Sequence, residues 1–487
     1  MTVASRRDML PRGEQTLLAF VRRTPRARGA QLLPPRYRPL GPGPGAERAR
    51  DVLVEVADLE LGHAQTVART EVAGQPGPLR ATRQPGARSC DELAVELNPF
   101  SYEFQENPYP IYRWLRDHEP LHRNEQLQFW ALSRFRDVLP SLVDWGTYSS
   151  SEGVVLERLD PKMLEATPMM ISLDPPRHDR LRKLVSRVFT PRRVESLEPF
   201  VRATAVRLLE PLAAEGGGDF VKDFSTPLPM EVIFTLLGVP DADRRQLREW
   251  TDLALERDPD TPAIPARALE ASLLQMRYWY ELLGELRRRP NDGLMCSLFE
   301  AELETDGGTT RLTDGEIIGF CSLLGAAGNE TTTKLLANAA VLFARHPGEY
   351  RKVLADPARL PGAIEEILRH SSPAQYAART VMRDVEWYGQ TVPQGARILL
   401  LIGSANHDER EYRDPDRFDV DRQIPEPLGF GQGVHFCLGA SLARLETRVA
   451  LEEFARRFPR YTVDENGCRR VHMSNVHGFA SVPFARA

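Results

Sequence analysis

One cysteine of the chain lies in a loop suited to close backbone contact. Gly429, Gly431 and Gly433 precede Cys437, and glycines allow a tight turn that brings the backbone close to a large, flat group. The spacing of leucines over residues 438–446 predicts a helix directly after the cysteine. A helix N-terminus lowers the pKa of a nearby thiol, so we expect a thiolate at Cys437. An isolated cysteine is more often a small buried apolar residue, but the glycines around this one favour the chemical interpretation.

A second group of polar residues interrupts a long predicted helix. Residues 313–346 open with a capping box and end at a proline, and their apolar faces predict one helix that crosses a domain. The run 325–333 contains two glycines and three threonines, which are poor helix formers. It indicates either a local opening, where Glu330 and Thr331 pass protons beside a cavity, or close packing against a neighbouring backbone.

Helical patterns dominate the chain from about residue 93 onward. Further helices are predicted over residues 109–117, 178–189, 194–214, 229–237, 263–289 and 360–370, and strands over residues 128–133, 381–392 and 397–401 and in the C-terminal tail. The predicted fold is mainly α with a small β part.

The first 92 residues differ in composition from the rest. Their start is rich in arginine, and proline and glycine concentrate at residues 41–45 and 75–78, so the stretch cannot bury enough apolar surface to offset its chain entropy. We expect residues 1–92 to be a largely disordered extension and residues 93–487 to be one folded unit. An organellar transit peptide and a nucleic-acid-binding arm are the alternatives for the extension.

Composition excludes several classes of protein. The 487 residues carry a net charge of −5, which gives no support for a nucleic-acid partner. The five cysteines are far apart in the sequence, which speaks against a zinc site or a disulfide framework and favours a reducing cytoplasm. No apolar run is long enough to span a membrane, and the N-terminus lacks the apolar core of a secretory signal.

The cysteine loop resembles that of a known family. Residues 430–439 read F-G-x-G-x-H-x-C-x-G, which is similar to the haem-binding loop of cytochromes P450, the haem-thiolate monooxygenases. Residues 327–331 resemble the family's A-G-x-(D/E)-T stretch, residues 366–369 its E-x-x-R helix and residues 415–418 its P-x-R-F segment. The resemblance runs from about residue 95 to the end of the chain and implies the cytochrome P450 fold, with haem between the long central helix and the helix after the cysteine loop.

The resemblance also implies roles for individual residues. Cys437 would be the axial ligand of haem b, where a thiolate favours O–O cleavage. Glu330 and Thr331 would deliver protons, with Gly328 making room for them. The other residues expected to bind the cofactor are His178, Arg182, Arg379, Phe430, Gly431, His435 and Gly439, of which the first three and His435 would hold the propionates. The expected structural network is Glu366, Arg369 and Arg417, and the expected substrate pocket includes Leu323, Leu324, Ala327 and Gln375.

The implied activity is insertion of one oxygen atom from O2 into a small apolar substrate, by hydroxylation or epoxidation. Electrons would come from a ferredoxin and its reductase, because the chain has no flavin- or nicotinamide-binding region. A haem-thiolate peroxygenase or isomerase is the alternative within enzymes, and the Glu330–Thr331 pair argues against both. A haem-binding carrier or gas sensor without turnover is the alternative outside them.

Overall fold

The computed structural model describes residues 96–157, 161–258, 264–305, 308–473 and 475–487. The chain divides into two units, residues 1–96 with 160–167, and residues 97–159 with 168–487. Of the first unit, the structure describes little beyond helix α6 (Pro161–Ala166). The expected extension, residues 1–92, lies outside the described residues, so its character and the boundary at residue 93 stay predictions. All that follows concerns the second unit.

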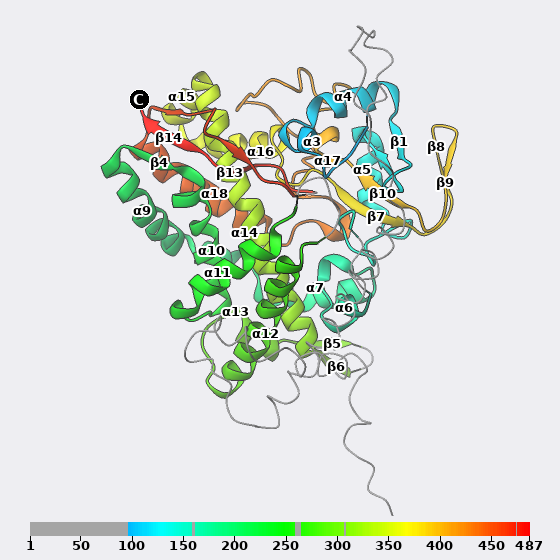
Figure 1. Cartoon of the computed structure of the whole chain (residues 1–487). Coiled ribbons are helices and arrows are strands. Elements are labelled where there is room, and N and C mark those ends of the chain that lie inside the picture. The colour runs from blue at the N-terminus through cyan, green and yellow to red at the C-terminus, as the bar shows by residue number, and fades with distance from the viewer. Residues whose placement is uncertain (1–95, 158–160, 259–263, 306–307, 474) are drawn as a thin grey trace, which may run out of the picture. The chain divides into compact units, whose positions relative to one another are not determined.

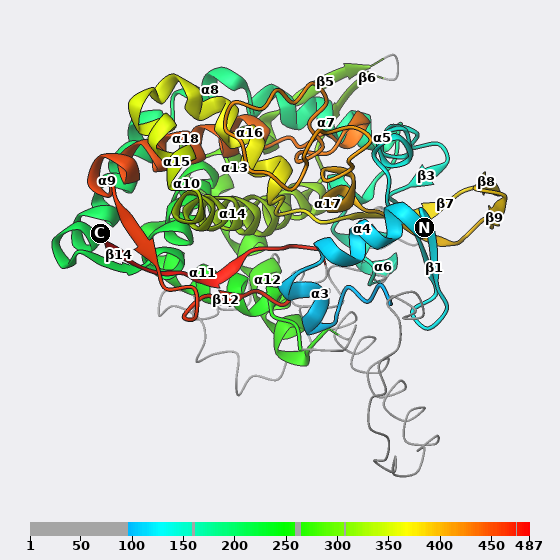
Figure 2. The ribbon, with the colours of Figure 1, turned by 90° about the horizontal axis from the view of Figure 1, so that it is seen from above.

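A single long helix, α14 (Asp314–Arg345), organises the second unit. Thr313 and Glu316 form the predicted capping box at its start, and it ends at His346 before a proline. Figures 1 and 2 show α14 running from the β5–β6 hairpin to α15 with other helices around it. Helices α10, α11, α12, α13, α15, α16 and α18 all pack against it. The fold is mainly α, as predicted.

The other helices follow in chain order. They are α3 (Tyr102–Glu106), α4 (Tyr109–His118), α5 (Phe135–Val143), α7 (Arg177–Val188), α8 (Pro191–Glu195), α9 (Glu198–Glu215), α10 (Pro227–Leu237), α11 (Asp241–Leu255), α12 (Ala266–Arg288), α13 (Leu294–Glu300), α15 (Pro347–Ala355), α16 (Leu360–His370), α17 (Ile402–Ala405) and α18 (Ala440–Arg457). Shorter turns of helix are η3 (Met170–Ser172), η4 (Phe220–Ser225), η5 (Pro357–Arg359) and η6 (Gly433–His435).

The largest sheet has the strand order β1-β2-β10-β7-β3. Its strands are β1 (Leu121–Asn124), β2 (Phe129–Leu132), β3 (Tyr148–Ser149), β7 (Ala377–Val381) and β10 (Arg397–Leu400). The pair β10–β2 is parallel and the other pairs are antiparallel. Both faces of β2 and β10 are buried, so this sheet lies inside the unit, and one core cluster joins it to α5.

The smaller sheets are mostly hairpins. They comprise β11 (Tyr461–Val463), β14 (Pro483–Arg486) and β4 (Gly217–Asp219) in one sheet, and the pairs β12 (Arg469–Arg470) with β13 (Phe479–Ser481), β5 (Glu302–Thr305) with β6 (Gly308–Arg311), and β8 (Val385–Trp387) with β9 (Gln390–Val392).

Two predicted elements are divided in the structure. The predicted helix 194–214 is wrong in its first part, because α8 ends at Glu195 and α9 starts afresh at Glu198 with a proline in its first turn. The predicted strand 381–392 is wrong because Tyr388 and Gly389, both with positive φ, turn the chain between β8 and β9. Helix α11 was not predicted, although Asp241 and Asp243 in its first turn are a typical start signal.

Candidate active site

The cysteine loop closes on itself before α18 begins. The backbone N–H of Cys437 donates to the carbonyl of Phe430 at 2.9 Å, which fixes the loop between them. Gly431 and Gly433 both have φ near +70°, where glycine is favoured. A Cβ at Gly433 would also lie 3.0 Å from the Cα of Val143, so α5 packs directly on the loop. The glycines therefore form the predicted tight turn, and their approach to a large, flat group stays a prediction.

Two opposing influences set the pKa of Cys437. Burial raises it, whereas the backbone N–H groups of Gly439 and Ala440 at the start of α18 lower it, together with Arg182 and Arg444. The start of α18 thus lowers the pKa of Cys437 as predicted, but the net direction for the free thiol is upward, because desolvation of a thiolate outweighs that effect. The donors that would favour a thiolate are nevertheless present around the sulfur.

Arg182 of α7 has partners other than the predicted one. Its guanidinium donates to the carbonyl of Val434 at 2.9 Å and to the carbonyl of Phe436 at 2.7 Å. Both carbonyls belong to the cysteine loop, so Arg182 ties α7 to that loop. The structure thus gives Arg182, one helical turn beyond His178, a positioning contact with the loop backbone, and its expected contact with a propionate stays a prediction.

Three predicted residues form a group that we call the polar cradle: His178 on α7, Arg379 on β7 and His435 on η6. The two imidazole rings lie 4.6 Å apart between centroids. The Nε2 atoms of both histidines are buried and have no hydrogen-bond partner among the described residues. Burial, followed by the charges of Arg379, His178 and Arg182, lowers the pKa of His435 to about 3.

Arg379 adds a buried cation to the polar cradle. Its side chain is 4 % exposed, and within the described part of the chain it donates to one acceptor, the carbonyl of Ala378, at 2.9 Å. Burial lowers its pKa to about 10, and Asp174 opposes that shift. A buried guanidinium has five N–H donors and is costly unless an anion pairs with it. The cradle therefore has the donors for a carboxylate that the protein itself does not supply.

The middle of α14 has two different faces. Leu323, Ala327 and Thr331, spaced by four residues, lie on a face that the described side chains leave partly unpacked, and Ala327 is exposed although the helix is central. Leu324 and Gly328 lie on the other face. A Cβ at Gly328 would be 2.8 Å from the side chain of Ile233 on α10. Close packing against Ile233 therefore accounts for a glycine at position 328, and the role of Gly328 in making room beside Glu330 and Thr331 stays a prediction.

The predicted acid and hydroxyl have separate partners. Thr331 Oγ1 donates to the carbonyl of Ala327 at 2.8 Å, so its own lone pairs stay available. Glu330 Oε1 lies 2.8 Å from the Nζ of Lys334, one turn further along α14, and both side chains are largely buried. The sequence interpretation missed Lys334. The feature that could have predicted this pair is a lysine four residues after the acid in an otherwise apolar stretch.

A set of buried charges, which we call the proximal network, contains Glu366 and Arg369 on α16 and Arg422 from the segment between α17 and η6. Arg369 donates to both oxygens of Glu366 at 2.7 and 2.9 Å, and Arg422 Nε donates to Glu366 at 3.2 Å. Arg369 also donates to the carbonyl of Asn406 at 2.8 Å. The network was predicted with Arg417 as its third member.

That third member is wrong. The side chain of Arg417 is 64 % exposed and pairs with Asp419 at 3.6 Å. Arg417 contributes its backbone carbonyl, which accepts from Arg422 at 2.9 Å. The side chain of Arg422 is 12 % exposed, so it takes the place assigned to Arg417. The chain turns between Arg417 and Arg422. The P-x-R-F segment contains Arg417, so the motif did not reveal that Arg422 is the arginine that points inward.

Gln375 does not lie in the predicted substrate pocket. Its side-chain amide donates to the carbonyl of Ser372 at 2.7 Å, and its Oε1 accepts from the hydroxyl of Tyr112 at 3.1 Å. A Cβ at Gly403 would collide with it. Gln375 is thus a packed core residue between α4 and α17. Of the other predicted pocket residues, Leu323 and Ala327 are on the partly unpacked face of α14 and Leu324 is on the packed one.

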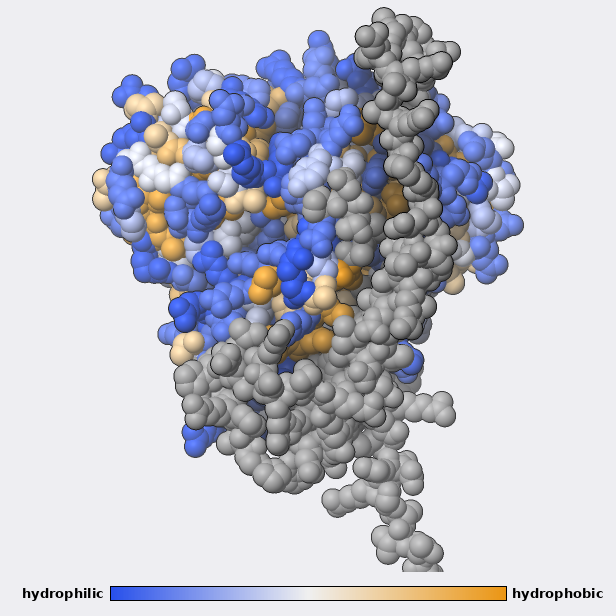
Figure 3. Space-filling model, viewed as in Figure 1, coloured by the Kyte–Doolittle hydropathy of each residue, from blue (hydrophilic) through white to orange (hydrophobic). Residues whose placement is uncertain are grey.

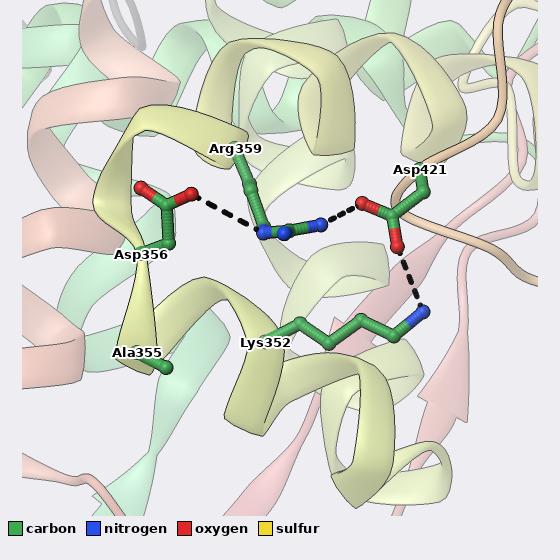
Figure 4. Close-up of a pocket in the computed structure, with 5 residues that line it drawn as sticks. All are labelled: Lys352, Ala355, Asp356, Arg359 and Asp421. Carbon is green, nitrogen blue, oxygen red and sulfur yellow. Dashed lines mark hydrogen bonds and ion pairs between the residues drawn. The ribbon is translucent and has the colours of Figure 1, made fainter.

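A surface hollow of about 300 Å³ lies elsewhere, lined by Lys352, Ala355, Asp356, Arg359 and Asp421. Figure 4 shows its charged groups turned toward one another. Lys352 pairs with Asp421 at 2.9 Å, and Arg359 pairs with Asp356 at 3.4 Å and also with Asp421. These charges satisfy one another, so the hollow offers little to a ligand.

Among the described residues, no helix is both long enough and apolar enough to cross a membrane. Figure 3 shows one face, on which hydrophilic residues cover most of the described surface and hydrophobic ones occur in small groups.

Comparison with known proteins decides the family. A family model for cytochrome P450 matches residues 275–479. The chain is 47% identical over 394 residues to the putative cytochrome P450 123 of Mycobacterium tuberculosis, covering 80% of this chain and 96% of that protein. The chain belongs to the cytochrome P450 family. It is also 39% identical over 361 residues to the cyclomarin C epoxidase CymV of Salinispora arenicola, covering 72% of this chain and 90% of that protein.

Solved structures agree with this assignment. The cytochrome P450 CYP109Q5 from Chondromyces apiculatus superimposes with a TM-score of 0.73 and 34% identity, over 81% of this chain and 98% of that one. The predicted cytochrome P450 fold and family are thereby confirmed. The protein is a haem-thiolate monooxygenase, an oxidoreductase that uses O2 and a redox partner.

The residues of this cytochrome P450 fit its cofactor, haem b. The polar cradle offers a buried cation and two buried imidazole nitrogens without partners among the described residues, which suits the two carboxylates of a haem. The thiol of Cys437 lies in a glycine loop beside Arg182 and Arg444, which suits a thiolate ligand. The fit is chemical: each orphaned group is of the type that haem would satisfy.

Proposed function

We propose that Cys437 is the axial ligand of the haem iron and that the polar cradle holds the haem propionates. The observation that carries this proposal is a set of buried groups: His178 Nε2 and His435 Nε2, which have no partner among the described residues, and the guanidinium of Arg379, which has one acceptor there, the carbonyl of Ala378. Buried polar groups are nearly always paired and a buried guanidinium is costly without an anion, so these groups suit a common anionic ligand. Phe430, Gly431 and Gly439 support it by shaping the loop around the sulfur.

When bound, haem with a thiolate ligand supplies the activation of O2 and the transfer of one oxygen atom. The chain supplies protons and position. Thr331, whose hydroxyl donates to the carbonyl of Ala327, accepts a hydrogen bond at Oγ1, and Glu330 provides the neighbouring carboxylate that takes up and releases protons. Arg182 orients the cysteine loop by holding the carbonyls of Val434 and Phe436.

We further propose that the substrate is a small apolar molecule, hydroxylated or epoxidised on the partly unpacked face of α14. Leu323 and Ala327 present hydrocarbon there, and apolar pockets with few polar groups select apolar ligands. The relationship to an epoxidase supports the reaction class. A cytoplasmic enzyme reduced by a ferredoxin and its reductase completes the proposal. Its support is that Cys296, Cys321, Cys437 and Cys468, the described cysteines, are free.

The absorption spectrum of the dithionite-reduced protein under carbon monoxide tests the ligand. We expect a strongly red-shifted Soret band that Cys437→Ala abolishes while the protein stays folded by circular dichroism. Cys321→Ala is the matched control, because Cys321 is buried on α14 and burial raises its pKa far above the usual range. An unshifted, histidine-like band in the wild type, or a shifted band that survives Cys437→Ala, would overturn the assignment.

Turnover separates the alternatives. Steroids, fatty acids, terpenoids and polyketides are screened for a change in the Soret band and then incubated with a surrogate ferredoxin, its reductase and NADH. An oxygenated product that needs the electron donor and O2 supports the monooxygenase. Product with hydrogen peroxide alone would favour a peroxygenase, and haem binding without any product would favour a carrier or sensor.

A further inference from the structure

A lysine is buried beside the predicted proton-carrying acid of α14. Lys334 is 4 % exposed, and its Nζ lies 2.8 Å from Glu330 Oε1. Lysine is almost never fully buried unless it is paired. The desolvation of such a pair can cancel its electrostatic gain, so a buried ion pair is weak evidence for a stabilising role. A different reason for this lysine is therefore worth seeking.

The stem of Lys334 has a place made for it. Gly478, just before β13, faces it so closely that a Cβ there would be 2.5 Å from the Cβ and 2.8 Å from the Cγ of Lys334. Those are the near, rigid atoms of the stem and cannot swing aside. The backbone of Gly478 does not have a positive φ, so space alone requires glycine there. The C-terminal segment thus fixes the direction in which Lys334 leaves α14.

Helix α11, which packs against α14, has two further charged side chains. Burial raises the pKa of Asp252 to about 6; Arg248 and Lys334 oppose that shift and Glu330 adds to it. Arg248, one turn earlier on α11, lies 3.8 Å from Asp252, and their side chains are 37% and 51% exposed. Both charges are therefore at the surface of α11.

The two members of the predicted proton-carrying pair are held in opposite directions along the helix. Thr331 is bonded back to Ala327, and Glu330 is bonded forward to Lys334. From these contacts we infer that Lys334 is a positioning residue that fixes the Glu330 carboxylate for proton supply at this point of α14. The inference rests on the proposed role of Glu330.

The reduction of O2 without any organic substrate tests this inference on the haem-loaded full chain. With a surrogate ferredoxin, its reductase and NADH, O2 leaves either as hydrogen peroxide, with one NADH and one proton consumed, or as two waters, with two NADH and two protons consumed. Proton supply governs this partition. We expect Lys334→Met to change the peroxide share by about threefold or more, and to change the solvent isotope effect on NADH oxidation in D2O, within the range of general acid–base effects.

Three further variants give the test its controls. Lys334→Arg should restore the wild-type partition, because it keeps the cation on Glu330. Gly478→Ala should give a smaller change of the same kind by displacing the stem. Lys352→Met is the matched control, since Lys352 pairs with Glu349 within one helix on the surface; its partition should equal that of the wild type. The carbon monoxide difference band verifies that each variant is folded and loaded.

A double-mutant cycle separates failure of this inference from failure of the proposed function. If Lys334 acts through Glu330, Lys334→Met adds nothing in a Glu330→Gln background, where the neutral pair also removes the risk of an unpaired buried charge. If Glu330→Gln itself changes neither the partition nor the isotope effect, the role of Glu330 is wrong. If Glu330→Gln changes both and Lys334→Met changes neither, or acts equally in both backgrounds, the positioning role is overturned.

Discussion

The proximal network and the polar cradle are both built from buried charged or polar side chains, but only one of them is complete. In the proximal network, Glu366 accepts from Arg369 and Arg422 and from the backbone N–H of Asp419. In the polar cradle, His178, Arg379 and His435 have donors or acceptors that no described residue meets.

This difference in pairing distinguishes buried charges that stabilise the fold from buried charges that can bind a ligand. A buried charge that is fully paired holds chain segments together and needs nothing further. A buried charge left without a counter-ion costs free energy unless something binds there. Both groups matched family motifs in the sequence, so the motifs alone did not distinguish the two roles. The presence or absence of hydrogen-bond partners in the structure distinguishes them.

The largest effect is expected from breaking the complete network. Glu366→Ala leaves Arg369 buried without its carboxylate, so we expect the free energy of unfolding to fall by about 3–5 kcal/mol. Urea denaturation followed by circular dichroism measures it. Arg417→Ala is the matched control, because that side chain is exposed, and should change stability by less than about 0.5 kcal/mol. Equal losses in the two variants would refute the assignment of Arg422 in place of Arg417.

For the polar cradle we expect a small effect on the stability of the haem-free protein and a clear effect on haem binding. Arg379→Met removes a buried cation without a protein counter-ion, so the haem-free protein should lose little stability. The haem-loaded protein should release haem about 10-fold faster or more, since a charge-assisted hydrogen bond contributes about 1.5–3 kcal/mol. Haem transfer to apomyoglobin measures the release. Unchanged release, together with a large loss of stability in the haem-free protein, would make Arg379 structural.

A buried acid can also avoid an unpaired charge by staying protonated, and from such a group we expect the smallest effect on stability. Glu446 on α18 is fully buried with no partner for its Oε1 among the described residues, and burial raises its pKa from 4.5 to about 8. Between these values the folded state keeps a proton that the unfolded state has released, so stability falls as pH rises. From pH 5.5 to 6.5 the loss should be about 1 kcal/mol. In Glu446→Gln the decline should be shallower by that amount; parallel pH profiles of the two proteins would contradict a neutral Glu446.

Local features of the sequence were sufficient for much of the site. The glycine loop around Cys437, the capping box of α14 and the helix Leu360–His370 all appeared as predicted. Each depends on residues within a few positions of one another, where turn and helix geometry are set by the backbone itself. The resemblance named His178 and His435 separately as partners of the propionates, and the structure places their rings 4.6 Å apart.

The sequence by itself therefore determined the family, the cysteine loop and the three residues that form the polar cradle. Only the tertiary structure decided that Arg422 replaces Arg417, that Arg182 holds the cysteine loop, that Gln375 is packed in the core and that Gly478 makes room for Lys334. The physical reason is that a side chain's partner depends on which distant segment packs against it. Lys334 and Gly478 are 144 positions apart in the chain, and no local pattern joins them.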